Sequence, residues 1–337
     1  MRRAVLVGAL LTTGSLALAA CAPATAPDPA GDRADASAVA QEAEELGQIT
    51  TPHELTGGTL LEGPTFSDDG ELFVVDVMAP PGEPKVLRID VSDGTAEPVY
   101  TDDESAFTSA QFGPDGRLYL TDIRGGTIQS IAADGTDPQV VFSGKVHGSR
   151  MQPDDLAFGS DDAMYVSDTT GMGGTSGDQG RVVRVAADGS ASVLADELPS
   201  PNGITFDENM DGLWIAQYNA NRIDYLALDE TGESVAETHA AIHIDGGRAR
   251  VDSTAVDAAG NVYQAFHHRA AIEVYSHDGE HLATIDVPDD AHDIDSATNI
   301  AIEPGTTDGY ITVSGPDGGY IYTFAALAEG TRQSNGG

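Results

Sequence analysis

The chain of 337 residues has one cysteine, one tryptophan and only 16 lysine and arginine residues, against 55 aspartate and glutamate residues. A single cysteine excludes a disulfide within the chain. The formal net charge is −39 and no basic cluster interrupts it, so we do not expect nucleic acid as a partner. Such acidity favours solubility and attracts cations, although most of these carboxylates should lie on the solvated surface.

The first twenty residues are typical of a targeting segment. Arg2 and Arg3 precede the apolar run "AVLVGALLTTGSLALAA", which is too short for a confident membrane span. The sequence Leu18-Ala19-Ala20-Cys21 resembles a bacterial lipobox, which implies cleavage before Cys21 and lipidation of its sulfur. The alternative is an ordinary signal peptide followed by an incidental cysteine. We predict an exported lipoprotein, held on the outer side of the cell membrane only through the lipid on Cys21.

The segment after the signal is unlike the rest of the chain. Residues 21–47 are rich in alanine, proline, aspartate and glutamate and have almost no large apolar side chains, which predicts a disordered tether. Residues 48–330 are long for an ordinary domain but normal for a large all-β architecture. We expect residues 331–337 to be a flexible tail.

One unit recurs six times in the long remainder. Each copy has a short apolar run, a turn that usually contains Asp-Gly or Ala-Gly, and a second run of alternating aromatic and aliphatic residues. This pattern predicts two strands joined by a tight hairpin. The copies start at Glu62, Thr108, Asp154, Asn202, Asp252 and Thr298, at separations of 46, 46, 48, 50 and 46 residues.

A third apolar run follows every copy, and a weaker fourth follows all but the last. Four strands per repeat, with a period near 47 residues, are typical of a propeller blade. We predict an all-β, six-bladed β-propeller with four-stranded blades, whose ring is closed by an N-terminal strand from "GQITTPHEL". A sandwich or barrel is the alternative, but neither explains so regular a repeat. We expect a monomer.

The first residue of each copy stands the same number of residues before an apolar position of the first run. In a propeller, the first strands of all blades line the central channel, so these six side chains should converge there. All six carry oxygen and three are carboxylates, which would repel one another without a cation. Ca²⁺ accepts about six to eight oxygen ligands, and Mg²⁺ and Mn²⁺ stay open. Zinc is not expected, because no histidine or cysteine occupies the predicted ring.

Two details qualify this ring. Ser253 could add a hydroxyl or carbonyl ligand beside Asp252. Because neighbouring residues of a strand point to opposite faces, Asp155 should point away from the cation that Asp154 contacts. The alternative to a metal site is that the ring residues cap strand ends and bind channel water.

Four motifs at blade spacing resemble the regucalcin/gluconolactonase family of six-bladed propellers, and are most similar to its Ca²⁺-dependent drug-responsive lactonase branch. The likeness covers about residues 48–326. It implies that Glu62, Asn202, Asp252, Asp154 and Ser253 hold the metal and that Asp252 is the catalytic acid and base. The motifs are Glu62-Gly63-Pro64, Asp154-Asp155-Leu156, Pro201-Asn202-Gly203 and Asp252-Ser253.

Other residues are candidates for the substrate pocket. Gluconolactonase-type members often carry an arginine where this chain has Gln152. Tyr218 and His267 follow the second strands of their blades and could form walls of the mouth, although simple packing or a rim position explains them equally well. Thr108 and Thr298 complete the ring.

Two function classes remain open. The first is a metal-dependent hydrolase that opens lactones or related esters, with a lactone or ester as its small-molecule partner. The second is a non-catalytic cell-surface propeller that binds a small ligand or a protein and uses the same metal for rigidity.

Overall fold

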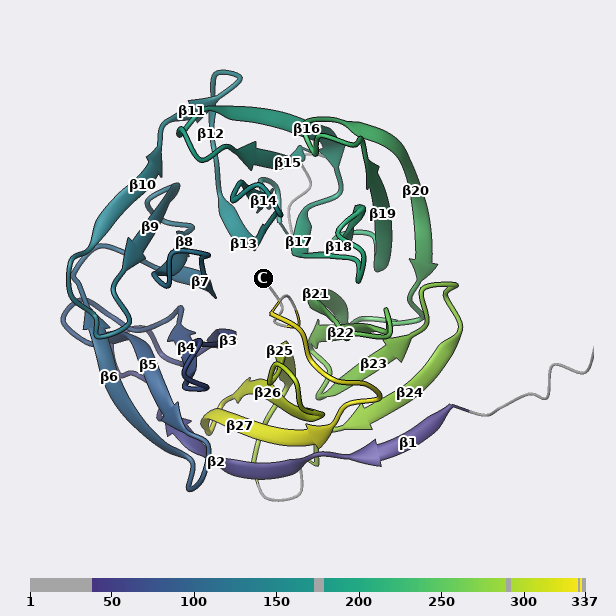
Figure 1. The fold of residues 1–337 in the computed structure, drawn as a ribbon. Coiled ribbons are helices and arrows are strands. Elements are labelled where there is room, and N and C mark those ends of the chain that lie inside the picture. The colour runs from purple at the N-terminus through teal and green to yellow at the C-terminus, as the bar shows by residue number, and fades with distance from the viewer. Residues whose placement is uncertain (1–37, 173–178, 289–291, 333, 335–337) are drawn as a thin grey trace, which may run out of the picture. The chain divides into compact units, whose positions relative to one another are not determined.

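The computed structural model describes residues 38–172, 179–288, 292–332 and 334. The residues after Ser37 form one compact unit. The described part of this unit consists of strands and connecting turns (Figure 1). Within it, no helix is present that could cross a membrane. Cys21, the signal segment and most of the predicted tether lie outside the described residues.

Four sheets of four strands follow one another along the chain, and in each the strands are neighbours in sequence order. The first contains β3 (Leu61–Phe66), β4 (Leu72–Asp76), β5 (Pro84–Asp90) and β6 (Thr95–Thr101). The second contains β7 (Phe107–Phe112), β8 (Leu118–Asp122), β9 (Thr127–Ile131) and β10 (Gln139–Ser143). After a short hairpin of β11 (Lys145–Val146) and β12 (Ser149–Arg150), the third contains β13 (Pro153–Phe158), β14 (Met164–Asp168), β15 (Gly180–Val185) and β16 (Ala191–Leu198). The fourth contains β17 (Pro201–Phe206), β18 (Gly212–Gln217), β19 (Arg222–Leu228) and β20 (Val235–His243).

The remaining strands form one nine-stranded sheet. One part of it contains β21 (Arg250–Val256), β22 (Val262–His267), β23 (Ala271–Tyr275) and β24 (His281–Asp286). The other contains β25 (Ser296–Ile302), β26 (Asp308–Gly315) and β27 (Gly318–Ala325). The two parts are joined by a single residue pair, Phe266 with Ala297. The prediction of an all-β fold built from four-stranded sheets is confirmed.

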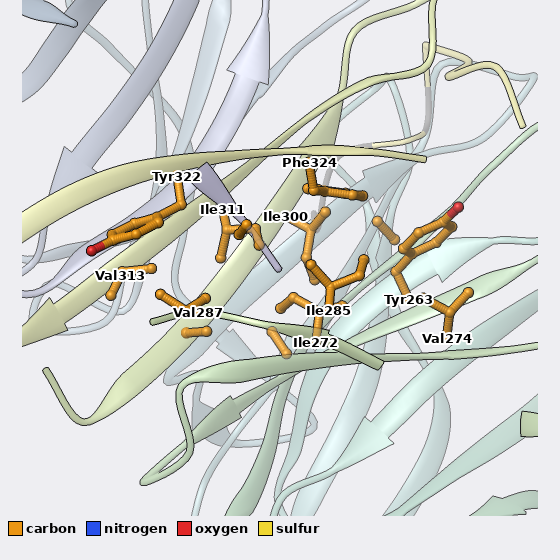
Figure 2. Close-up of a cluster of buried hydrophobic side chains, with 14 of the residues drawn as sticks. Tyr263, Ile272, Val274, Ile285, Val287, Ile300, Ile311, Val313, Tyr322 and Phe324 are labelled. Carbon is orange, nitrogen blue, oxygen red and sulfur yellow. The ribbon is translucent and has the colours of Figure 1, made fainter. Parts of the chain in front are cut away.

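The sheets are arranged around a centre in Figure 1, with β3, β7, β13, β17, β21 and β25 innermost. Neighbouring sheets pack through apolar side chains. Phe112, Phe158 and Phe206 at the ends of inner strands each contact an aromatic ring of the preceding sheet edge-to-face, with centroids 5.2, 4.9 and 5.0 Å apart. The largest buried cluster lies between β22–β24 and β25–β27 (Figure 2). This packing fixes where each inner strand presents its polar residues.

The predicted tether is shorter than expected at its C-terminal end. Val39–Glu42 form β1, which pairs in parallel with β24, and Glu44–Thr50 form β2, which pairs with β27. These polar segments bury little apolar surface. They are ordered by backbone hydrogen bonds to exposed strand edges, which composition does not reveal. The prediction of disorder is therefore wrong for residues 39–47.

The described residues of the predicted flexible tail, 331, 332 and 334, have defined contacts. The C-terminal segment runs from β27 towards the centre of the ring (Figure 1). The Arg332 guanidinium donates to the carbonyl of Gly113 at 2.6 Å, and the Ile302 amide donates to the carbonyl of Ser334 at 2.8 Å. Ser334 is buried. Its contacts are at the C-terminal ends of inner strands, so Arg332 and Ser334 lie at the opposite ends of these strands from the predicted ring residues.

Candidate functional site

The six inner strands share a distortion at the predicted ring. In each of them, the pairing with the second strand shifts register at this point, as in a β-bulge. The shift breaks the alternation of side chains, so that two consecutive residues can point towards the channel. The shifts lie between Glu62 and Thr65, Phe107 and Ser109, Pro153 and Leu156, Pro201 and Ile204, Val251 and Thr254, and Ala297 and Asn299.

Glycine is required beside Glu62. Gly63 has a φ of +55°, and a Cβ atom there would lie 2.3 Å from the backbone nitrogen of Ala110 on the next inner strand. We expect Gly63→Ala to lower the free energy of unfolding by about 3 kcal/mol, from backbone strain plus overpacking. Gly116→Ala is the control, because its φ is +75° but the space around it is open, and we expect about 1 kcal/mol there. Urea unfolding measures both variants. An equal loss of unfolding free energy in Gly63→Ala and Gly116→Ala would contradict the close approach of Gly63 to Ala110.

Four predicted metal ligands are brought together. Glu62, Asp154, Asn202 and Asp252 are all buried, with 2–6% of each residue exposed. Oxygens of Glu62 and Asp252 lie within 4.8 Å of each other. Burial raises the pKa of Asp252 well above its ordinary range, and a hydrogen bond with the Asn202 side chain partly offsets this rise. The Asn299 amide donates to Oε2 of Glu62 at 3.3 Å. The inner strands therefore place three carboxyl groups and an amide in one small polar site.

The electrostatics of this site are unfavourable to anions. Burial is the main cause that raises the pKa values of the carboxyl groups well above their ordinary range. The charges of Asp252, Asp155 and Asp154, in that order, raise the pKa of Glu62 further. Without a compensating charge, these groups hold protons that exposed carboxyl groups release.

Three carboxylate oxygens have no hydrogen-bond partner among the described residues, although they are buried. They are Oδ2 of Asp154, Asp155 and Asp252. Buried charges are normally paired or bound to a metal, because an unpaired one costs several kcal/mol. An oxygen-rich group of carboxylates with an amide fits a divalent cation.

Strand alternation predicts that Asp155 points away from the cation, towards backbone donors or solvent between the sheets. Asp155 is 1% exposed, its side chain hydrogen-bonds Ser253, and it is close enough to Asp154 and Asp252 for their charges to raise its pKa, after burial. The register shift between Pro153 and Leu156 is the physical reason, because it turns two successive side chains inward. The expectation for Asp155 is wrong, and this carboxyl group adds to the charge of the site.

Ser253, Thr108 and Thr298 have other partners than those predicted. The Ser253 side chain bonds Asp155. The Thr108 hydroxyl donates to the carbonyl of Asp154 at 3.1 Å, and the Thr298 hydroxyl donates to the carbonyl of Leu61 at 2.8 Å. Both threonines thus brace neighbouring inner strands and do not offer a free hydroxyl to a pocket.

The mouth contains two of the other predicted pocket residues. Tyr218 and His267 pack edge-to-face, with ring centroids 5.8 Å apart. Burial raises the pKa of the Tyr218 hydroxyl, and the nearby carboxylate of Asp252 raises it further. Gln152 is exposed. Its backbone N–H donates a hydrogen bond to Asp168, and its carbonyl accepts one from the Thr169 N–H.

The position of His267 qualifies one argument from sequence. Its Nε2 lies 3.0 Å from Oδ2 of Asp252, and it shares a group with Glu62 and Asp252 whose ligand atoms all lie within 4.8 Å. Burial lowers the pKa of the imidazole to about 4, so the ring is neutral at pH 7. No histidine occupies one of the six ring positions, but His267 reaches the ring residue Asp252 from the second strand of the hairpin. The signal was available in the hairpin, because His267 pairs with Arg250, two residues before Asp252.

Comparisons with known proteins agree with this geometry. The chain is 28% identical over 284 residues to a protein named lactonase drp35 from Staphylococcus saprophyticus, covering 81% of this chain and 85% of that one. Among solved structures, it is similar to a gluconolactonase from Xanthomonas campestris, with a TM-score of 0.66, 20% identity and coverage of 84% and 96%. It is also similar to a calcium-binding regucalcin from Agrobacterium tumefaciens, with a TM-score of 0.69, 16% identity and coverage of 88% and 99%.

The structural neighbours share the fold of this chain. The model of the SMP-30/gluconolactonase/LRE-like region matches residues 60–314, which include every inner strand from β3 to β25. The resemblance drawn from the four motifs is confirmed, and this chain belongs to the SMP-30/gluconolactonase/LRE-like family.

Proposed function

We propose that the protein is a divalent-metal-dependent hydrolase that opens lactones or related cyclic esters at the mouth of its central channel. The observation that carries this proposal is the set of buried carboxylate oxygens without partners on Asp154, Asp155 and Asp252. The names of the sequence relatives supply the reaction class. In this proposal the nine-stranded sheet counts as two blades, which makes six, and β2 closes the ring against β27.

The residues of the site have separate tasks. Glu62, Asn202, Asp252 and Asp154 would hold the cation. When bound, it would supply positive charge to polarise the lactone carbonyl, stabilise the oxyanion and acidify water. Asp252 would accept a proton from the attacking water and return it to the leaving alkoxide, a role that suits a carboxyl group whose pKa burial has raised.

The mouth favours an uncharged substrate. Gln152 stands where gluconolactonase-type relatives often have an arginine, so the chain lacks that donor for the hydroxyl groups of a sugar-acid lactone. Tyr218 and His267 supply aromatic surface instead. The net charge of −39 also repels anionic substrates. We propose simple aliphatic and aromatic lactones as the substrate class.

The location of the enzyme follows from its first residues. The lipobox-like Leu18-Ala19-Ala20-Cys21 supports export and lipid anchoring at Cys21, with the propeller on the outer side of the membrane. We propose that it acts there as a monomer.

A panel of lactones and esters tests the hydrolase. We expect protein loaded with Ca²⁺, Mg²⁺ or Mn²⁺ to open aromatic and aliphatic lactones, measured by pH-stat titration, and to lose this activity in EDTA. Sugar-acid lactones should be poorer substrates. A protein that binds the metal but hydrolyses nothing in the panel would instead be the non-catalytic binding propeller.

A further inference from the structure

His267 ends the second strand of its hairpin and lies one register position beyond Phe266, the counterpart of three aspartates in other sheets. At the same end of the second strand lie Asp76, Asp122 and Asp168, which pair with Leu61, Phe107 and Pro153 at the start of the inner strands. The carboxylates of these aspartates accept hydrogen bonds from the backbone N–H groups of residues just before the inner strands. Asp76 accepts from Leu60 at 3.1 Å, Asp122 from Ala106 at 3.1 Å and Asp168 from Gln152 at 2.9 Å. The His267 imidazole instead reaches the ring residue Asp252 of its own hairpin.

The contact between His267 and Asp252 is close but is not a hydrogen bond. Nε2 and Oδ2 are 3.0 Å apart, yet Oδ2 has no hydrogen-bond partner in the described part of the chain. The two atoms therefore approach each other without an N–H group aligned between them. An oxygen of Glu62 lies within 4.8 Å of both.

This arrangement fits a shared cation. With metal–ligand bonds of about 2.1 Å, adjacent ligand atoms of one ion lie about 3 Å apart. The edge of the Tyr218 ring packs against the imidazole and restricts its orientation. His267 is partly exposed, with 21% of its side chain accessible, whereas Asp252 is buried. The nitrogen therefore caps the carboxylate group on the side of the mouth.

We propose that His267 is a ligand of the metal, so that the site combines oxygen with nitrogen and prefers a first-row transition metal such as Mn²⁺ or Zn²⁺ to Ca²⁺. Ca²⁺ and Mg²⁺ select oxygen ligands, whereas imidazole suits the transition metals. This inference rests on the proposed metal site and decides among the ions that the ring of oxygens leaves open.

The test compares His267→Gln with the neighbouring His268→Gln. Metal-stripped protein is titrated with Mn²⁺, followed by the electron paramagnetic resonance of free Mn²⁺, and with Ca²⁺ by calorimetry. We expect the wild type to bind Mn²⁺ more tightly than Ca²⁺. We expect His267→Gln to weaken Mn²⁺ binding about tenfold or more and Ca²⁺ binding less than threefold, because only the transition metal gains from the nitrogen. His268 is exposed, so His268→Gln should change neither.

A spectroscopic readout completes the test. Electron spin echo modulation from ¹⁴N should be present with Mn²⁺ bound to the wild type and to His268→Gln, and absent in His267→Gln. Equal losses of Mn²⁺ and Ca²⁺ affinity, or ¹⁴N modulation that persists in His267→Gln, would overturn the proposal. Lactone turnover is not part of this measurement. A protein that binds Mn²⁺ through His267 but opens no lactone would therefore support this ligand while contradicting the proposed hydrolase.

Discussion

Asp252→Ala is expected to lower kcat/KM for lactone opening by at least about 10³-fold. General acid–base catalysis contributes about 10² to 10⁴ on its own, and the substitution also removes an oxygen ligand. Asp252 is 2% exposed, and the Asn202 side chain hydrogen-bonds it, so its carboxyl group is held in place. The check is steady-state kinetics at saturating metal, with circular dichroism to establish that the variant is folded.

A second variant separates the two roles of Asp252. Asp252→Asn keeps an oxygen that can bind the cation but cannot carry the proton. We therefore expect it to retain metal binding, weakened, while kcat falls about as far as in Asp252→Ala. Asp188→Asn is the matched control, because Asp188 is exposed in a turn before β16. Activity in Asp252→Asn within tenfold of the wild type would exclude Asp252 as the acid and base.

The metal-free protein is expected to lose stability as the pH rises. Burial raises the pKa values of Glu62, Asp154, Asp155 and Asp252 in the folded state, whereas the unfolded chain releases these protons near pH 4. Between the unfolded and the folded values, the folded state binds more protons. The free energy of unfolding then falls with pH, by about 1.4 kcal/mol per pH unit for each such proton. A bound cation replaces these protons, so its stabilisation should be larger at pH 8 than at pH 5.

Urea unfolding at pH 5 and pH 8, in EDTA and with metal, measures this effect. The surface of so acidic a chain also contributes to pH dependence, and Asp252→Asn serves as the control for it. In EDTA at pH 8 this variant should be more stable than the wild type, because it removes one of the crowded carboxylates, and the difference should shrink at pH 5. A difference that does not depend on pH would mean that the site is not under electrostatic strain.

The sequence predicts the ring because it repeats. Glu62, Asp154, Asn202 and Asp252 occupy one position of the repeat, and strands that share a centre bring equivalent positions together. In the structure all four are buried, and oxygens of Glu62 and Asp252 lie within 4.8 Å of each other. The side chains next to them were harder to predict. Asp155 faces inward because of a register shift, and alternation of side chains assumes a regular strand.

His267 was only a weak candidate from sequence because it does not belong to the inner strand. It reaches Asp252 across the hairpin, from the end of β22. Aligning the ends of the second strands does not single it out, because its neighbour Phe266 stands at the register position of Asp76, Asp122 and Asp168. The chain ends were mispredicted for another reason. Val39–Glu42 and Ser334 are ordered by partners far away in sequence, and local composition carries no information about such partners.

Lactone turnover measured against metal occupancy tests the central claim most directly. Metal-stripped protein would receive stepwise amounts of Mn²⁺, with bound metal and initial rate of lactone opening determined at each step. We predict no turnover at zero occupancy and a linear rise that ends at one ion per chain. Turnover that persists without metal, or that does not follow occupancy, would contradict the proposal that this ring of buried carboxylates is the metal centre of a lactone hydrolase.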